Sequence, residues 1–422
     1  MELKFPQGFL WGAATSAHQV EGGNVNDWSE WEHANSARLA AEAARRHTKT
    51  PTRIPDYILE RYPNPLQPEN YISGRACDHY NRFEEDFNIA KSLGHNAHRF
   101  SIEWSRIEPQ EGKFDEKEIE HYRQVILALR ERGLEPFVTL WHWTNPVWVR
   151  DLGGPESKKF PLYFSRYVKY VVEKLGDSVE YWCTLNEPTS VIVNSYQRGN
   201  WPPQKRSFLA VQKVYKNLAA AHNLAYDEIH KINSGTQIGV ANILNYFEPQ
   251  NKSSILDKLA LKIAKYYSNE EFLKLTKNKH DFLTAQYYFY NKIKFPSRIN
   301  NKAEVNSDMD WGIRPEGLYY ILKELKKYSK PIYITENGLA DVKDDRRADF
   351  IKGHLKWIHK AIEEGVDVRG YFYWSLLDNF EWDKGFWPRF GLVEIDYETL
   401  ERKIRPSAYE YAKICKNNIL NI

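Results

Sequence analysis

Short apolar runs alternate with helical patterns along almost the whole chain. Eight runs are rich in β-branched or aromatic residues and are short enough to be buried strands. Between them lie stretches in which apolar residues recur every three or four positions, as on one face of a helix. Repeated strand-helix units predict a parallel sheet, and eight of them predict a closed (β/α)8 TIM barrel of the α/β class. The predicted strands are residues 9–16, 97–101, 135–140, 180–185, 237–242, 281–287, 331–335 and 370–374.

Three of the intervening segments carry clear helix signals. Asp115 is a suitable N-cap with Glu118 three residues later, and Gly133 ends the apolar pattern that follows. A second stripe precedes the fifth strand, and Pro315 opens a helix ahead of the seventh. The two stripes are Ile119, Tyr122, Ile126 and Leu129, and Phe208, Val211, Val214 and Leu218.

Residues 34–74 interrupt this alternation, before a helix that begins near Asp78. Residues 36–47 are rich in Ala and basic side chains, and five prolines follow, so we predict a helix and then an extended surface loop. The whole chain, 1–422, is predicted to be one domain that carries this insertion. Two interpretations of the insertion remain: a decoration without chemistry, or a rim that shapes substrate entry or contacts another copy in a homo-oligomer. A solvated basic face is expected from Arg45, Arg46, Lys49 and Arg53.

Composition narrows the class of protein. Apolar residues make up 42% of the 422 residues and charged residues 27%, which is typical of a folded globular chain. The net charge of +3 arises from interspersed acids and bases, so we expect no nucleic-acid partner. Cys77, Cys183 and Cys415 have no paired spacing, which argues against disulfides and a zinc site and for a cytoplasmic protein. No apolar run approaches the length of a membrane span, and we expect no membrane partner.

Polar residues gather directly after the predicted strands. In a (β/α)8 barrel these positions surround one mouth, where the active site lies. Glu187 follows the fourth strand and Glu336 the seventh, so the two side chains face each other across the mouth. Glycosidic bond cleavage requires such a pair of carboxylates, about 5–5.5 Å apart in a retaining enzyme. The pair therefore indicates a retaining glycosidase.

The neighbours of the two carboxylates suggest different roles. Arg99 is expected to keep Glu336 ionised, because a nearby cation lowers a carboxylate pKa, and Tyr288 to donate a hydrogen bond to it. Glu336 then suits nucleophilic attack. Glu187, beside an ionised neighbour, keeps its proton until it protonates the leaving oxygen, and later acts as a base toward water. Taken singly, each residue also has a structural explanation, and only their joint placement favours catalysis.

Four motifs carry a resemblance that runs nearly end to end. They are Phe9-Leu10-Trp11-Gly12-Ala13-Ala14-Thr15-Ser16, Asn186-Glu187-Pro188, Thr335-Glu336-Asn337-Gly338, and the run from Trp374 to Trp382, WSLLDNFEW. The chain resembles glycoside hydrolase family 1, the β-glucosidase and β-galactosidase family. The resemblance implies that Glu187 is the acid/base and Glu336 the nucleophile, and it implies no cofactor or metal.

The resemblance also implies the residues of the sugar site. Asn186 is expected to contact the sugar 2-hydroxyl, Glu381 to bind the 4- and 6-hydroxyls, and Trp374 to stack on the ring. A 6-phosphate would meet Glu381 as a like charge, so we expect unphosphorylated β-O-glycosides, β-glucosides foremost, with β-galactosidase or β-fucosidase side activity. The remaining expected substrate-binding residues are Gln19, His142, Trp143, Trp382 and Phe390.

Several positions depart from the family pattern. Thr144-Asn145 stands where the family often has Asp after the His-Trp pair, and Gln286 stands where Asn is usual. The insertion at 34–74 is unusual, and residues 247–281 form a short segment for the family. We expect these changes to affect the outer, leaving-group subsite and to leave both carboxylates untouched.

Three other functions remain as alternatives. A transglycosylase would use the same site and transfer the sugar to an alcohol or a second sugar instead of water. A non-catalytic sugar-binding protein would use the same fold, since fold alone does not fix function. A metalloenzyme is suggested only by scattered histidines without a compact ligand spacing, namely His18, His79, His95, His98 and His142.

Overall fold

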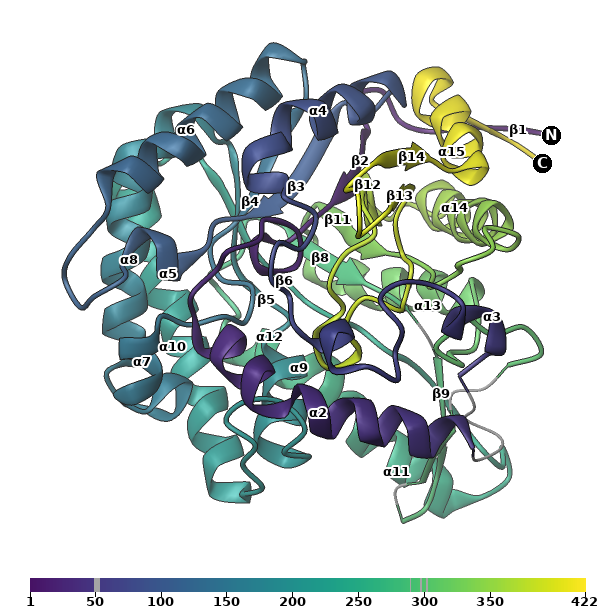
Figure 1. Ribbon diagram of the computed structural model, residues 1–422. Coiled ribbons are helices and arrows are strands. Elements are labelled where there is room, and N and C mark those ends of the chain that lie inside the picture. Colours follow the sequence, from purple (N-terminus) through teal and green to yellow (C-terminus); the bar gives the residue numbers. More distant parts are fainter. Residues whose placement is uncertain (49–53, 289, 297, 301–302) are drawn as a thin grey trace.

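The computed structural model describes residues 1–48, 54–288, 290–296, 298–300 and 303–422. Eight parallel strands at its centre are surrounded by helices (Figure 1). In space they follow the order β6-β5-β4-β3-β2-β12-β11-β8, and the outer two meet where Gln286 N–H donates to Asn242 O at 2.9 Å. All eight predicted strands are therefore present in one barrel. Their bounds are β2 Leu10–Ala14, β3 Ala97–Ser101, β4 Glu135–Thr139, β5 Tyr181–Asn186, β6 Gln237–Ala241, β8 Leu283–Gln286, β11 Ile332–Asn337 and β12 Val368–Trp374.

The helices of the outer layer form where the apolar stripes predict them. Asp115 caps α6 (Glu116–Glu131) by accepting the Lys117 N–H at 2.9 Å, and Ser207 caps α10 (Phe208–Ile232). Pro315 precedes α13 (Glu316–Leu325), and Asp78 precedes α4 (His79–Ser92). The other long helices of the layer are α8 (Phe160–Leu175), α14 (Arg347–Glu363) and α15 (Pro406–Asn417).

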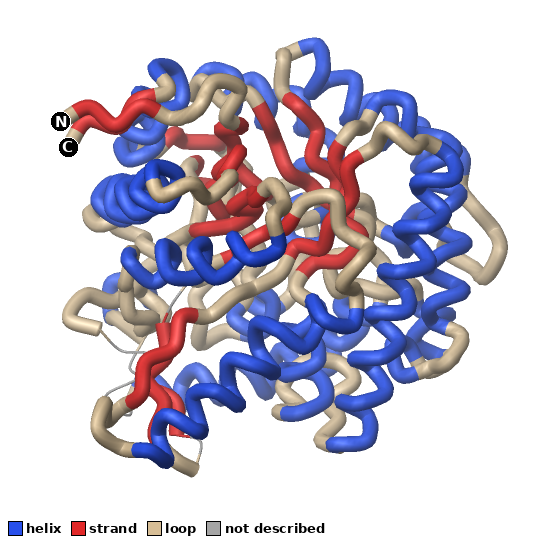
Figure 2. The backbone as a smooth tube through the Cα atoms, turned by 180° about the vertical axis from the view of Figure 1, so that it is seen from behind, coloured by secondary structure: helices blue, strands red, loops and turns tan. Residues whose placement is uncertain are grey.

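The barrel interior is filled by aromatic side chains. The ring of Phe137 lies 5.3 Å from Phe282, 5.5 Å from Tyr333 and 5.2 Å from Phe372, and all four residues are buried. Because packed interiors resist rearrangement, this cluster gives the strand ends above it a rigid base. Seen from behind, the strands form the same central ring (Figure 2). The chain termini pair with each other through β1 (Glu2–Lys4) and β15 (Ile419–Asn421).

The insertion differs from its prediction. Its helix, α2 (Asp27–His47), begins nine residues before the predicted start at residue 36, because Asn26 accepts the N–H groups of Trp28 and Ser29 and forms a capping box. Beyond it lie α3 (Asp56–Leu59) and the 3₁₀ turn Pro68–Tyr71, and Asn70 and Tyr71 are buried instead of exposed. Arg45 and Arg46 are exposed as predicted, whereas Lys49 and Arg53 lie outside the described residues.

The loops at the mouth carry further small elements. After β5 come α9 (Pro188–Val191) and a π-helical turn, Ile192–Gln197. A three-stranded sheet of β7 (Tyr246–Pro249), β9 (Tyr290–Lys294) and β10 (Arg298–Asn300) joins the segments that follow β6 and β8. The helices α11 (Ile255–Lys265) and α12 (Glu271–Leu275) lead back to β8. The remaining elements are α1 (Ala17–Val20), α5 (Trp104–Ile107), α7 (Val147–Asp151), β13 (Val393–Ile395) and β14 (Arg402–Ile404).

Candidate active site

Glu187 and Glu336 stand at the carboxyl ends of β5 and β11. Glu336 lies within β11, opposite Gln286 of β8, and Glu187 follows the last residue of β5. The Glu187 backbone is left-handed, with φ of 41°, and its N–H donates to Ala241 O at 2.7 Å. Both side chains are almost fully buried, at 5% and 4% exposure. Two carboxylates are thus held in one poorly solvated place.

Backbone strain recurs among the residues around the mouth. Trp143 and Trp382 are also left-handed, with φ of 79° and 50°. Such conformations are unfavourable for residues with a bulky side chain and persist where the surrounding structure enforces them. Three expected site residues therefore share a feature that is typical of functional sites.

Glu336 is bound on both oxygens by donors from β3 and from the segment that follows β8. Arg99 Nη1 donates to Oε1 at 2.5 Å and the Tyr288 hydroxyl donates to Oε2 at 2.5 Å. Arg99 is itself held, because its Nε donates to Thr139 Oγ1 at 3.1 Å. The contacts expected of Arg99 and Tyr288 are therefore present.

The pKa of Glu336 differs from the simple expectation. Burial raises its pKa above the usual range, and the charge of Arg99 and the hydrogen bond from Tyr288 oppose that rise without cancelling it. Burial also raises the pKa of the Tyr288 phenol well above 10, so this side chain remains a donor. Arg99 therefore offsets the cost of charge at Glu336 but does not make it an unusually strong acid.

Glu187 has no comparable cation. Burial and then the charge of Glu336 raise the pKa of Glu187 to about 8, and a hydrogen bond from Ser190 Oγ at 2.6 Å lowers it only in part. Since only Glu336 contacts an arginine, a proton shared by the pair resides on Glu187. Of the two carboxyl groups, Glu187 is thus the one whose surroundings favour the neutral form.

Asn186 links the nucleophile side of the site to His142. Its Oδ1 accepts from Arg99 Nη2 at 2.7 Å and from Gln286 Nε2 at 3.0 Å, which fixes the amide so that Nδ2 faces His142 Nε2 at 3.1 Å. Burial lowers the pKa of His142 well below 6.5, so the ring is neutral. Its Nδ1 has no hydrogen-bond partner among the described residues, and this N–H is available to a ligand.

Gln19 and Glu381 form a second polar group. Gln19 Nε2 donates to Asn379 Oδ1 at 2.9 Å and to Phe380 O at 2.8 Å, and lies 3.5 Å from Glu381 Oε2. Burial and the charge of Glu336 raise the pKa of Glu381 to about 8. The segments that follow β2 and β12 are therefore joined at this carboxyl group.

Aromatic rings surround these polar groups. Trp382 lies 4.6 Å from Trp143 and is stacked on His142 at 6.0 Å, and Trp374 is also stacked on His142, at 6.0 Å. Phe390 meets Tyr288 edge-on at 6.3 Å. All the expected site residues therefore belong to one connected set.

The sequence patterns missed several supporting residues. Asn70 of the insertion donates to Lys384 O at 2.9 Å and accepts the Phe386 N–H at 3.1 Å, which anchors the loop that follows Glu381. Glu32, in the part of α2 that was not predicted, contacts His18 Nε2 at 2.6 Å, and the ring of His18 stacks on Trp382 at 5.5 Å. The insertion and the start of α2 are therefore structural parts of the mouth, and the polar residues Asn70 and Glu32 were the only available signals.

The two unusual residues after His142-Trp143 also have buried partners. Thr144 Oγ1 donates to Glu103 Oε2 at 2.9 Å, and Asn145 donates to Asp27 from both its backbone and side-chain nitrogens at 2.8 Å. Carboxylates from neighbouring segments thus contact the positions where the family pattern often has an acid.

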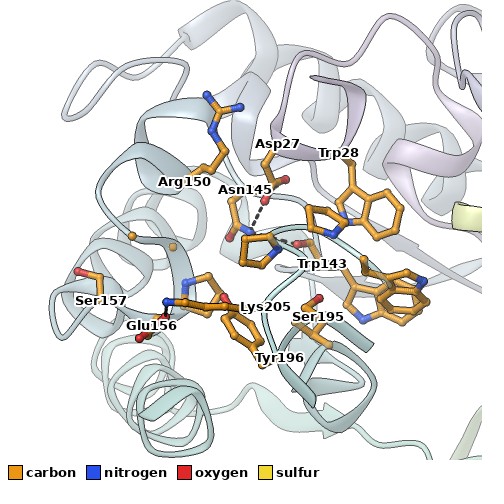
Figure 3. A pocket seen from close by; sticks show the side chains of 17 residues that line it. Asp27, Trp28, Trp143, Asn145, Arg150, Glu156, Ser157, Ser195, Tyr196 and Lys205 are labelled. Atoms are coloured by element: carbon orange, nitrogen blue, oxygen red, sulfur yellow. Dashed lines mark hydrogen bonds and ion pairs between the residues drawn. The ribbon is translucent and has the colours of Figure 1, made fainter. Parts of the chain in front are cut away.

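A cavity of about 460 Å³ opens beside Trp143 and Asn145 (Figure 3). Its lining comes from the segments that follow β2, β4 and β5, and includes Trp28, Tyr196 and Trp201. It shares only Trp143 with the expected site residues, and neither Glu187 nor Glu336 lines it. Burial raises the pKa of Asp27 in this cavity to about 7. The cavity thus adjoins the expected site at Trp143 and does not include the two carboxylates.

The metal interpretation gains no support from the geometry. Among the described residues, no three His, Cys, Asp or Glu side chains gather as possible ligands. Two of the histidines that suggested it have other partners: His79 contacts Asp86 at 2.7 Å and His98 contacts Thr15 at 3.2 Å. No described helix is long and apolar enough to cross a membrane.

Comparison with known proteins gives one consistent family. β-Glucosidase A of Thermotoga maritima is 34% identical, with 98% of each chain covered. The structure of a β-glycosidase from Pyrococcus horikoshii superposes with a TM-score of 0.86 at 35% identity, over 100% of this chain and 97% of that one. A β-glucosidase from Thermotoga maritima in complex with glucoimidazole gives a TM-score of 0.85 at 32% identity, over 98% and 99%. The model of glycosyl hydrolase family 1 matches residues 1–292 and 265–420, and the chain belongs to that family.

Proposed function

We propose that the protein is a retaining β-glycosidase that releases the non-reducing terminal sugar of small, unphosphorylated β-O-glycosides. In this proposal Glu187 protonates the glycosidic oxygen while Glu336 attacks the anomeric carbon and forms a covalent glycosyl-enzyme intermediate. Glu187, now ionised, then removes a proton from the water that hydrolyses this intermediate. Both the proton and the nucleophile come from side chains, so the reaction needs no cofactor.

One observation carries the proposal, namely the unequal surroundings of the two carboxylates. Glu336 accepts from Arg99 and Tyr288, whereas burial and the nearby charge of Glu336 raise the pKa of Glu187 to about 8. A pair of carboxyl groups whose environments favour opposite protonation states is the arrangement that acid and nucleophile require. When Glu336 becomes esterified its charge disappears, which lowers the pKa of Glu187 and suits it to act as the base.

The polar groups around the pair favour a hexose with free hydroxyls, and glucose foremost. His142 Nδ1 has no protein partner among the described residues, and Asn186 is fixed beside it for the 2-hydroxyl. Gln19 and Glu381 suit the 4- and 6-hydroxyls, and Trp374, Trp143, Trp382 and Phe390 provide the apolar walls. A site built to pair with hydroxyl groups rejects a sugar that lacks them. The name β-glucosidase of the Thermotoga maritima relative supports this choice, with β-galactosidase or β-fucosidase side activity.

A phosphorylated sugar is disfavoured by the charges near Glu381. Lys384, the nearest cation in its loop, is paired with Asp383 at 2.5 Å. A 6-phosphate would therefore enter a buried place without a free cation from this loop, and burying an unpaired charge is costly. We also propose that residues 1–422 act as one glycosidase domain and that the protein is cytoplasmic, which the three buried free cysteines support.

The test is a panel of aryl β-glycosides with glucose, galactose, fucose and glucose-6-phosphate as the sugar. We expect the glucoside to be the best substrate and the phosphorylated one to be inert. Glu336→Ala should abolish turnover, and azide should restore it in part with inversion at the anomeric carbon. Folded protein that turns over none of the panel would refute the proposal, and products formed only by transfer to added alcohol would favour the transglycosylase.

A further inference from the structure

The helix α11 presents its apolar side to solvent. Ile255, Leu256, Leu259 and Ile263 lie on one face, at the spacing of successive helical turns, and their exposed fractions are 80%, 53%, 51% and 52%. We call these four residues the apolar stripe. A helix on the surface of a globular protein normally buries such a stripe against the core, so its orientation here needs a reason.

The opposite face of α11 anchors the helix by a polar group. Asp257 is the only fully buried residue of α11, and its carboxylate accepts the N–H groups of Asn251 at 2.9 Å and Phe295 at 3.0 Å. This contact holds the turn after β9 against the first turn of the helix and places Phe295, itself 48% exposed, beside it. The outward direction of the stripe is therefore fixed by a buried carboxylate and its hydrogen bonds.

Basic residues accompany the stripe. Residues 250–300 contain ten Lys and Arg against four Asp and Glu, whereas the whole chain has 59 against 56. On α11 itself Lys258 and Lys262 are exposed, and neither forms an ion pair within the described part of the chain. The segment that carries α11 is thus more basic than the chain as a whole, and two of its exposed lysines lie beside the stripe.

A binding partner of the apolar stripe and its lysines must offer both an apolar environment and negative charge. A second copy of the chain would join two surfaces that both carry these exposed lysines, because a two-fold interface uses the same patch on each subunit, and it would bring no negative charge to them. Nucleic acid would satisfy the lysines but would leave the isoleucines and leucines in water. An anionic bilayer satisfies both, because an amphipathic helix buries its apolar face at the headgroup boundary while its lysines stay among the headgroups.

The position of α11 suits contact with a flat surface. Figures 1 and 2 both place it with β9 at the lower edge of the molecule, outside the ring of barrel helices. The strands β7 and β9, which pack with α11, follow the carboxyl ends of β6 and β8. Glu187 and Glu336 lie at the same end of the barrel. We propose that the apolar stripe and Phe295, with Lys258 and Lys262, form a surface that adsorbs peripherally to membranes containing anionic lipid.

The sequence led us to expect no membrane partner, and the exposed stripe revises that expectation. The absence of a long apolar run excludes a span from the described helices, but it says nothing of a helix that lies in the plane of the interface. The helix α11 has 11 residues, three of them lysines, so a search for long apolar runs passes over it. Only its outward orientation in the fold reveals the surface.

The test is co-sedimentation of the full chain with vesicles. We expect binding to vesicles of equal parts phosphatidylglycerol and phosphatidylcholine, little binding to phosphatidylcholine alone, and weaker binding as salt rises. Leu259→Ser with Ile263→Ser should lower the partition coefficient about tenfold or more, since two large apolar side chains no longer enter the interface. Lys258→Gln and Lys262→Gln should each lower it about fivefold.

Matched controls separate this surface from general stickiness. Leu162→Ser changes an equally exposed leucine on α8, and it should leave vesicle binding unchanged. All these variants should retain wild-type turnover of an aryl β-glucoside, because none lies near the two carboxylates. Equal binding to both kinds of vesicle, no binding, or an equal loss in Leu162→Ser would overturn the proposal. So would a wild-type dimer that Leu259→Ser with Ile263→Ser dissociates, which would assign the stripe to a second copy.

Discussion

Replacing the proposed acid by its neutral isostere should stabilise the protein in alkaline solution while disabling it. Glu187→Gln keeps the shape of the side chain and removes only its ability to ionise. In the folded protein burial and the charge of Glu336 raise the pKa of this carboxyl from 4.5 to about 8. Between these values the unfolded chain releases the proton and the folded protein retains it. The wild type therefore loses stability as pH rises from 4.5 to 8, and the variant is spared that part of the loss.

The size of the effect has a ceiling set by the pKa shift. At about 1.4 kcal/mol per pKa unit, a shift of about 3.5 units lowers the free energy of unfolding of the wild type by about 5 kcal/mol. This loss is complete above pH 8 and absent below pH 4.5. Because unfolding entropy is about 2 cal/mol/K per residue, a 422-residue chain shifts its Tm by about 1 °C per kcal/mol. The variant should therefore gain up to about 5 °C over the wild type between pH 5 and pH 9. Shared titration with Glu336 reduces the observed part of this gain.

The assay is thermal unfolding of both proteins at matched scan rates from pH 5 to pH 9. Glu398→Gln, at an exposed carboxylate, is the control and should follow the wild type at every pH. The same variant should hydrolyse alkyl β-glucosides about 10²- to 10⁴-fold more slowly, with a much smaller loss for dinitrophenyl β-glucoside, whose leaving group needs no proton. A Tm difference that stays constant or shrinks with rising pH would show that Glu187 does not hold the proton, and the assignment of roles would fail.

Two further predictions test the acid and the loop that supports the sugar site. The kcat/KM of the wild type for alkyl glucosides should fall as pH rises through about 8, because Glu187 in the free enzyme loses its proton. The same fall in kcat/KM at alkaline pH in Glu187→Gln would argue against this assignment. Asn70→Ala should cost about 1–3 kcal/mol of stability, because the loop after Glu381 loses its anchor, and it should raise KM more than it lowers kcat. The control is Asn64→Ala, in the same insertion but away from that loop, which should leave KM unchanged.

The barrel and its mouth were predictable because both depend on local signals. A strand such as β6 is buried from Ile238 to Ala241 and reads as a short apolar run, and a polar residue directly after such a run must lie at the mouth. Arg99 and Glu336 come from different strands, yet the fold alone requires their side chains to converge. The contact at 2.5 Å follows from two separate patterns and needs no long-range information.

The insertion was only partly predictable, for the opposite reason. Asn26 looks like any polar loop residue, and its capping of α2 depends on where the preceding chain leaves β2. Asn70 stands in a proline-rich stretch that resembles a surface loop, and only the fold brings it to Phe386, more than 300 residues away. Residues that support a site through such distant contacts leave no periodic signal in the sequence.

The protonation states could not be predicted from neighbours alone. Arg99 was expected to leave Glu336 with a low pKa, but burial outweighs the cation, and the pKa of Glu336 is raised. The cost of burying charge falls on both carboxylates, and also on Glu381. What separates acid from nucleophile is therefore not a low pKa at Glu336 but the ion pair with Arg99, since no described cation contacts Glu187. Burial of these carboxyl groups therefore both lowers the stability of the protein and sets the different protonation states on which catalysis depends. Glu187→Gln should reveal both effects, the first in thermal unfolding and the second in the hydrolysis rate.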